Sequence, residues 1–213
     1  MGPSPVEQVY GMVIKTQPVG EYDKLITLLT KERGKITAFA RGARRQNSSL
    51  MGVTRVFATG KFNLREGKDS YNLYSAQIDN FFEPLFSDLE GSCYGTYFLE
   101  LADYYSREML SDPQLLKLIY VALTALSKDS IPNKLVRRVY ELRAMVISGE
   151  YDAEPLSDDE TIRYTWEFVT KTPVTKLYTF NLTEEKFEIF EKCVDHCLKK
   201  YVDREMKSLE MLI

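Results

Sequence analysis

Apolar residues in the first third of the chain fall in short stretches that are rich in β-branched and aromatic residues and are bounded by glycine, proline or acidic residues. Such stretches are typical of β-strands. The pattern predicts five strands, over Val9–Thr16, Leu25–Thr30, Ile36–Ala40, Val53–Leu64 and Tyr71–Ile78. Gly60 lies within the fourth stretch and predicts a bulge or kink there. Five short strands in about 75 residues predict a small closed barrel, of which the OB-fold is one kind and other five-stranded barrels are alternatives.

From Pro84 onward the apolar residues recur at helical spacing, three and four positions apart. The predicted helices cover Ser92–Leu110, Pro113–Ser127, Pro132–Ser148, Thr161–Thr170 and Glu184–Leu209. Asp112 is expected to cap the second of these helices, and Asn181 or Thr183 the last. Leu177–Leu182 is predicted as a short extended piece between the last two helices.

Charge divides the chain where the hydrophobic pattern changes. The net charge is −3 at pH 7, from 28 Lys and Arg against 31 Asp and Glu. Residues 1–80 hold 12 basic and 7 acidic side chains, a net of +5, whereas residues 81–213 hold 16 and 24, a net of −8. We therefore predict an α+β multidomain protein with a five-stranded OB-fold barrel over residues 1–80, suited to a polyanion, and an all-α helical domain over residues 81–213.

The segment Lys31–Arg45 is strongly basic, with six cationic residues against the single acid Glu32. Its first part predicts a tight turn at Gly34, because glycine accepts a positive φ at no steric cost. Beyond the third strand, Arg41–Ser49 predicts a loop of small residues that carries several guanidinium groups. Guanidinium groups suit phosphate oxygens, so the segment indicates contact with a nucleic-acid backbone. The competing interpretation is a basic hairpin that only faces solvent.

The chain offers little for catalysis. His196 is its only histidine, and no phosphate-binding glycine loop or nucleophile motif occurs. Cys193, His196 and Cys197 share a helix face, but a structural zinc site wants four ligands, usually from two chain segments. Acidic clusters at 150–154 and 158–160 fit solvated loops and helix N-termini better than a metal site. We expect no catalytic residue, no metal site and no cofactor.

Cysteine content and hydropathy favour a cytoplasmic protein. Three cysteines, an odd number, indicate free thiols in a reducing compartment. The longest largely apolar run, Leu118–Leu126, is far shorter than the ~20 residues that span a bilayer. The N-terminus lacks the basic start and apolar core of a signal peptide.

Two further sets of side chains have both a structural and a functional interpretation. Tyr71 and Tyr74 on a barrel face can stack bases at roughly 1–3 kcal/mol each, whereas the tyrosines of the first long helix favour the core. Arg137 and Arg138 lie off the apolar stripe of their helix. Arg137 is expected to form a weak surface pair with Glu141. The alternative is that the two arginines dock an acidic peptide tail.

A series of motifs in this chain resembles one bacterial family. The motifs, in chain order, are Gly20–Asp23, Thr30–Lys35, Ala40–Arg45, Tyr97–Leu101, Arg138–Arg143 and Tyr201–Met211. With them the chain is similar, over nearly its whole length, to the DNA repair and recombination mediator RecO family. The resemblance implies an N-terminal OB-fold, a helical C-terminal domain and no catalytic turnover.

The resemblance also implies an activity and partners. Family members bind single- and double-stranded DNA, anneal complementary strands and, with RecR and RecF, help load the RecA recombinase on DNA coated by single-stranded-DNA-binding protein (SSB). A nucleoid-associated, cytoplasmic location follows from this role. Many members carry a four-cysteine zinc module after the helix that ends here at Gly149. In this chain Tyr151 leads into Asp152–Asp159 without a cysteine, so we expect a member without that module.

The family motif carries the expected DNA contacts onto Lys35, Arg41, Arg44 and Arg45. Charge alone adds Lys15 and Lys24 in the same basic half.

The acidic-apolar tail of SSB is expected to meet Arg137 and Arg138. Two other functions stay open: an OB-fold RNA-binding or translation-associated protein, and an enzyme that uses the acidic clusters.

Overall fold

The computed structural model describes residues 5–68 and 70–212. The chain folds into two compact units that interleave along the sequence. The first contains the chain up to Glu83 together with Ala102–Leu116; the second contains Pro84–Leu101 and the chain from Lys117 onward. The domain boundary after residue 80 stays a prediction.

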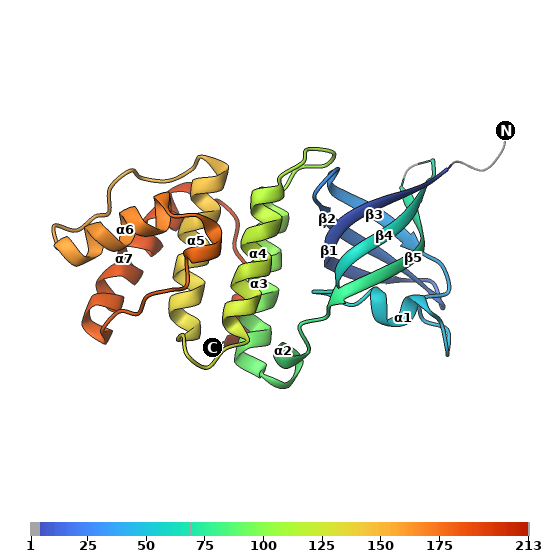
Figure 1. The fold of residues 1–213 in the computed structure, drawn as a ribbon, viewed down its shortest axis with the longest axis horizontal. Helices are drawn as coiled ribbons and strands as arrows, with labels where there is room; N and C mark the ends of the chain where they lie inside the picture. The colour runs from blue at the N-terminus through green and yellow to red at the C-terminus, as the bar shows by residue number, and fades with distance from the viewer. Residues whose placement is uncertain (1–4, 69, 213) are drawn as a thin grey trace. The chain divides into compact units, whose positions relative to one another are not determined.

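The first unit is built on β1 (Val6–Val19), β2 (Asp23–Thr30), β3 (Gly34–Ala40), β4 (Thr59–Glu66) and β5 (Tyr71–Asn80). These strands form a closed barrel in the order β1-β2-β3-β5-β4 (Figure 1). Neighbours are antiparallel except β3 and β5, which pair in parallel with Phe39 opposite Asn72. The predicted five-stranded barrel followed by helices is confirmed.

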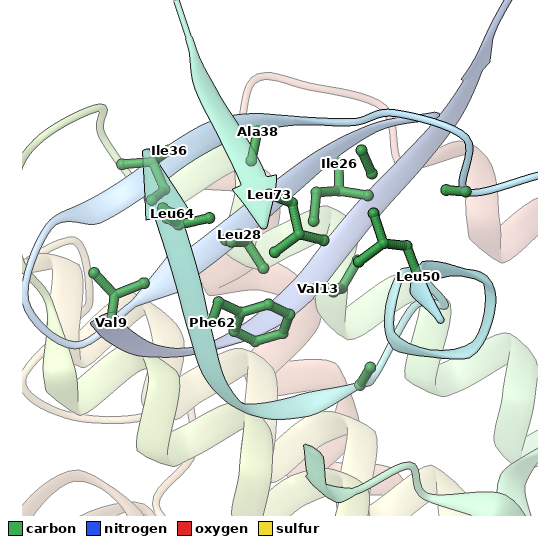
Figure 2. Packing of buried hydrophobic residues seen from close by; sticks show 13 residues of the cluster. Val9, Val13, Ile26, Leu28, Ile36, Ala38, Leu50, Phe62, Leu64 and Leu73 are labelled. Atoms are coloured by element: carbon green, nitrogen blue, oxygen red, sulfur yellow. The ribbon is translucent and has the colours of Figure 1, made fainter. Parts of the chain in front are cut away.

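The barrel core follows from the alternation of apolar residues. In β3, every second residue is buried and the residues between are half-buried. Figure 2 shows Leu28, Phe62 and Leu73, from three different strands, converging inside the barrel. All three are at most 5% exposed. Removal of this apolar surface from water is the main source of the barrel's stability.

The segment between β3 and β4 differs from the prediction of one long strand over Val53–Leu64. The short helix α1 (Leu50–Val53) ends there, and β4 begins only at Thr59. Thr54 stabilises the helix end, because its hydroxyl donates to the carbonyl oxygen of Leu50 over 2.8 Å. Leu50 itself joins the barrel core, so packing overrides the local β-propensity of the sequence.

Gly60 marks the predicted irregularity. The β4–β5 register shifts between Thr59 and Gly60, as a bulge requires. A Cβ atom on Gly60 would lie 2.2 Å from the carbonyl oxygen of Gln77, so only glycine fits without a shift of the backbone.

Helices make up most of the remaining chain: α2 (Glu83–Ser87), α3 (Leu89–Tyr105), α4 (Pro113–Leu126), α5 (Asn133–Ser148), α6 (Glu160–Lys171) and α7 (Glu184–Tyr201), with short 3-10 helices η1 (Val174–Lys176) and η2 (Lys207–Leu212). Within the second unit, α5, α6 and α7 pack against one another (Figure 1). The Trp166 and Phe190 rings meet edge to face between α6 and α7, with their centres 6.3 Å apart. Phe98 of α3 stacks on Tyr140 of α5 at 4.1 Å.

The two predicted helix caps are confirmed, whereas α3 begins at Leu89, three residues before the predicted Ser92. Asp112 accepts a hydrogen bond from the Leu115 amide over 3.0 Å at the start of α4. Thr183, rather than Asn181, caps α7 and accepts from the Lys186 amide over 3.4 Å. These caps satisfy amide groups that the first helical turn leaves without partners.

Two predicted helix ends are wrong, and one predicted extended piece does not form. Helix α7 ends at Tyr201 instead of Leu209, and the chain then turns so that Glu100 accepts from the Ser208 amide over 2.9 Å. Leu177–Leu182 contains turns and irregular backbone, and Leu177, directly after η1, is fully buried.

Helix α3 ends at Tyr105 instead of Leu110, because the following residues bind the β2–β3 turn of the first unit. The amide of Lys35 donates to the carbonyl of Arg107 over 3.3 Å, and the Met109 amide donates back to the carbonyl of Lys35 over 3.3 Å. Gly34 sits in this contact with φ +64°, and a Cβ atom there would lie 2.0 Å from the carbonyl oxygen of Leu110. The predicted tight turn therefore also needs glycine for close packing.

Candidate nucleic-acid interface

A row of outward-facing side chains crosses the barrel wall. The register aligns four of them from β2 to β4, in the order Leu25, Phe39, Asn72 and Arg65. Each has an immediate chain neighbour in the barrel core, so the alternation of a strand points these four away from it. In OB-folds the face of the second and third strands is the surface that oligonucleotides meet.

The loop after β3 is fixed against the β1–β2 loop at the end of this face. The Gly42 amide donates to the Asp23 carboxylate over 2.7 Å, and the Arg44 amide donates to the carbonyl of Tyr22 over 2.8 Å. Ala43 is fully buried in the barrel core. The backbone of the predicted small-residue loop is therefore held in place by hydrogen bonds, and its arginines project from a defined position.

Arg41, Arg44 and Arg45 are all exposed. The Arg44 guanidinium donates to the carbonyl of Gly20 over 3.1 Å, and the Arg45 guanidinium lies 5.1 Å from the centre of the Tyr22 ring. Within residues 5–68 and 70–212, no carboxylate forms an ion pair with any of the three arginines. Their charge is therefore available to an anion from solution.

Lys24 adds to the positive charge at this end of the barrel. Its ammonium donates to the Thr54 hydroxyl over 3.2 Å and is half-buried. Burial lowers the pKa of Lys24, and the nearby positive charges of Arg44 and Arg55 lower the same pKa further. Because cations repel a proton here, the site favours the approach of an anion. Arg55 is in turn paired with Glu83 over 3.3 Å.

The other two predicted DNA-binding lysines differ from each other. Lys15 is exposed on β1, opposite Thr27 on the outward face. Lys35 lies at the opposite end of β3 from the arginine loop, where its ammonium pairs with the Asp103 carboxylate over 3.0 Å and its side chain is 19% exposed. Lys35 is therefore engaged within the first unit, and the interface proposed below does not use it.

The barrel tyrosines also differ. Tyr71 packs against the barrel core. Tyr74 is 62% exposed, and the Arg65 guanidinium lies 5.0 Å from its ring centre. Tyr22 is 44% exposed beside Arg45. The sequence interpretation did not select Tyr22, Arg55 or Arg65; the alternation around Leu64 is the signal that places Arg65 on the outward face.

Arg137 and Arg138 form a buried ionic cluster in the second unit instead of a surface pair. Glu141 is fully buried and accepts from Arg137 over 2.8 Å, from Arg138 over 2.8 Å and from the Tyr97 hydroxyl over 2.7 Å. Arg138, 8% exposed, also pairs with Glu191 over 3.0 Å. Burial lowers the pKa of Arg138, but the attraction and hydrogen bonds of Glu141 and Glu191 outweigh this and raise it overall.

The acidic clusters are held by ordinary contacts. Asp159 caps α6, accepting from the Ile162 amide over 3.2 Å, and pairs with Lys186 over 2.6 Å. Asp152 pairs with Lys200 over 2.5 Å. Cys193 and Cys197 are buried, and burial raises the pKa of both thiols. In the described part of the chain, no three His, Cys, Asp or Glu side chains gather as metal ligands would.

The comparison with protein families identifies the chain. A closed five-stranded barrel with a cationic loop, followed by helices, is the architecture of an OB-fold nucleic-acid-binding protein. Residues 6–82 match the family model for the N-terminal part of recombination protein O, and residues 86–151 match the model for its C-terminal part. Together the matches span well over half of the chain, and the chain belongs to the RecO family of DNA repair proteins, which are non-enzymatic recombination mediators.

Curated relatives agree with this assignment. The chain is 29% identical to the DNA repair protein RecO of Clostridium perfringens, over 95% of both chains. It is 36% identical to RecO of Acetivibrio thermocellus, over 65% of this chain and 55% of the relative. It is 30% identical to RecO of Listeria monocytogenes, over 68% of this chain and 57% of the relative. The last two alignments thus span little more than half of those relatives.

No helix in residues 5–68 and 70–212 has the length and apolar content for membrane crossing.

Proposed function

We propose that the chain binds the sugar-phosphate backbone of single- and double-stranded DNA through the end of the barrel that carries Arg41, Arg44 and Arg45, with Lys15 and Lys24 beside them. The observation that carries this proposal is a backbone-fixed loop with three exposed arginines that pair with no carboxylate of the described chain. The planar guanidinium group is pre-organised for phosphate oxygens, so little conformational freedom is lost for each hydrogen bond that it forms. The acidic remainder of the chain makes this the favoured anion-binding side.

We propose further that DNA binding serves strand annealing and, with RecR and RecF, the loading of RecA on SSB-coated DNA. This part rests on membership of the RecO family. Annealing fits a surface that holds the backbone, because the base edges of a held strand stay free to pair.

The experiment is a salt titration of single-stranded DNA binding by the whole chain. The wild type is expected to lose affinity linearly on a logarithmic salt scale. Arg44→Gln with Arg45→Gln should lower the slope by about 1.4, since each phosphate contact to a single strand adds ~0.7. A matched control removes two exposed cations from α6, Arg163→Gln with Lys171→Gln, and should leave the slope unchanged. Equal slopes for all three proteins would contradict the proposal.

A preference for structured RNA over single-stranded DNA, measured by direct competition, would favour the RNA-binding alternative. The same arginine loop would then serve another polyanion, because phosphate contacts do not distinguish the two nucleic acids; the 2′-hydroxyl does.

The SSB tail is a second proposed partner, through Arg137 and Arg138. The motif resemblance supports it, while the buried pairs with Glu141 limit what these guanidinium groups can offer to a peptide. Titration of an acidic tail peptide into the wild-type chain tests it directly. Arg137→Gln, at the more exposed of the two positions (20% against 8%), is the informative variant and should weaken peptide binding without affecting DNA binding. Unchanged peptide affinity would remove Arg137 from the proposed contact.

A further inference from the structure

The barrel presents two exposed tyrosines, and each has an arginine against its ring. Arg45 lies 5.1 Å from the centre of the Tyr22 ring, and Arg65 lies 5.0 Å from the centre of the Tyr74 ring. The two pairs come from different parts of the barrel, the loops after β1 and β3 and the strands β4 and β5. Despite the arginines, Tyr22 remains 44% and Tyr74 62% exposed, so much of both ring surfaces is accessible.

The two tyrosines flank the exit of β3. Tyr22 directly precedes β2, which pairs with β3. Tyr74 lies on β5, two residues beyond the Asn72–Phe39 pair, and since β3 and β5 run in parallel this places Tyr74 level with Arg41. With neighbouring strands ~4.8 Å apart, about two strand spacings, or roughly 10 Å, separate the backbone positions of the two tyrosines. A few nucleotides of an extended strand reach both, well within the ~4–16 nucleotides that one OB-fold holds.

Tyr74 is exposed at a bulge in the β4–β5 register, next to the core residue Leu73. Tyr71, three residues earlier on the same strand, packs against the core, whereas Tyr74 lies at the register shift and is exposed. A large aromatic side chain that a bulge turns into solvent contributes little to the fold. The same ring is suited to stack on a base, because every base has an apolar face.

We propose that Tyr22 and Tyr74 are base-stacking sites for single-stranded DNA, and that Arg45 and Arg65 bind the phosphates next to the stacked bases. This rests on the proposed DNA-binding function of the same barrel end and adds a specificity to it. The arginine loop alone reads only the backbone and accepts single strands and duplexes alike. The tyrosines add affinity for single strands only, since the base faces of a duplex are already stacked on one another.

The test compares three probes: oligothymidine, an abasic chain of the same length, and a blunt duplex. Tyr22→Ala and Tyr74→Ala should each lower the affinity for oligothymidine by about 5- to 150-fold, as loss of one stacked base does, and should leave the other two affinities unchanged. Tyr22→Phe and Tyr74→Phe keep the ring and should keep the affinity for oligothymidine. The backbone contact of Tyr22 with Arg44 survives all these substitutions, because it uses the carbonyl.

The outcomes separate this inference from the function it rests on. An equal loss on all three probes would mean that the tyrosines only hold the loops in place, and would overturn stacking while DNA binding stands. No loss on any probe would overturn it as well. Failure of the wild-type chain to bind oligothymidine or the duplex at low salt would instead overturn the proposed function itself.

Discussion

Two pairs of adjacent arginines, Arg44-Arg45 in the barrel unit and Arg137-Arg138 in the helical unit, look alike in sequence and differ in almost every physical respect. The loop pair is exposed, contacts only a carbonyl oxygen and a tyrosine ring, and faces no carboxylate of the described chain. The helix pair surrounds the fully buried Glu141. An arginine doublet by itself thus indicates neither binding nor stability. Whether such a pair is free to bind an anion or stabilises the fold depends on whether the fold places a carboxylate beside it.

The difference follows from where each pair sits. A loop at a barrel end can leave its side chains in water at no desolvation cost. A helix packed on its neighbours cannot, and buried guanidinium groups need a fully hydrogen-bonded anion. We therefore expect substitutions in the two regions to separate cleanly into effects on DNA affinity and effects on the free energy of unfolding.

The largest effect is expected from Glu141→Gln. The substitution keeps the shape but leaves Arg137 and Arg138 without their shared anion, which should lower the free energy of unfolding by about 3–5 kcal/mol. Urea denaturation followed by circular dichroism measures it. Glu191→Gln is the matched control, because Glu191 pairs with Arg138 from a position 36% exposed and its loss should cost far less. Similar costs for the two variants would contradict the buried-cluster description.

A smaller loss is expected from Arg138→Lys. Lysine keeps the charge but cannot reach Glu141 and Glu191 together, as the guanidinium does. The expected loss in unfolding free energy is about 1–3 kcal/mol. Arg44→Lys with Arg45→Lys is the counterpart in the loop and should change stability by less than about 0.5 kcal/mol. If the loop variant proved the less stable of the two, the comparison would be reversed.

Lys35→Met tests the cation that the family motif groups with the arginines but the fold separates from them. Loss of the pair with Asp103 should lower the free energy of unfolding by about 1 kcal/mol, and the salt dependence of DNA binding should stay that of the wild type. If Lys35→Met lowered the salt dependence of DNA binding as much as an arginine substitution does, Lys35 would have to be part of the DNA interface.

The smallest effect concerns the exposed pair of Asp152 and Lys200, where the side chains are 29% and 50% exposed. The hydrogen bond from Lys200 lowers the pKa of Asp152 below that of the unfolded chain. The pair therefore stabilises above the unfolded pKa of Asp, about 3.9, and this stabilisation is lost as the pH falls through the lower folded pKa. Asp152→Asn should cost under about 1 kcal/mol at pH 7, and the cost should shrink as the pH falls below about 3.9 toward the lower folded pKa. A cost that does not change with pH would point to lost hydrogen bonds rather than lost charge.

The barrel was predictable because alternation and turn residues are local signals. Gly34 and Gly60 each mark the irregularity that their sequence context indicates. Helix α1 was not predictable in the same way, since Val53 and Thr54 favour a strand and only the burial of Leu50 in the core decides against it. The early end of α3 likewise depends on a partner, the β2–β3 turn, that is distant in sequence.

The exposed arginines of the loop could be predicted, because the loop consists of small and polar residues that favour the surface. The ion pair of Lys35 could not be predicted, because its partner Asp103 lies 68 residues away along the chain. For Arg138 the second partner, Glu191, is 53 residues away, and the burial of the nearby Glu141 depends on packing that the sequence does not show. Such ion pairs form only when the fold brings both partners together. The sequence therefore identifies candidate cations but does not show which are paired with an acid and which are free to bind an anion.

The contact between the β2–β3 turn and residues 107–111 bears on how the protein is dissected experimentally. Ser111 donates to the carbonyl of Lys31 over 2.6 Å, and Gly34 leaves room for the carbonyl of Leu110. A barrel fragment that ends after β5 would lose this contact and also Asp103, the partner of Lys35. Weak DNA binding by such a fragment would then reflect a destabilised β2–β3 turn, and not a role of the helical unit in DNA binding. A chimaera that retains Ala102–Leu116 beside the barrel is the fairer minimal protein.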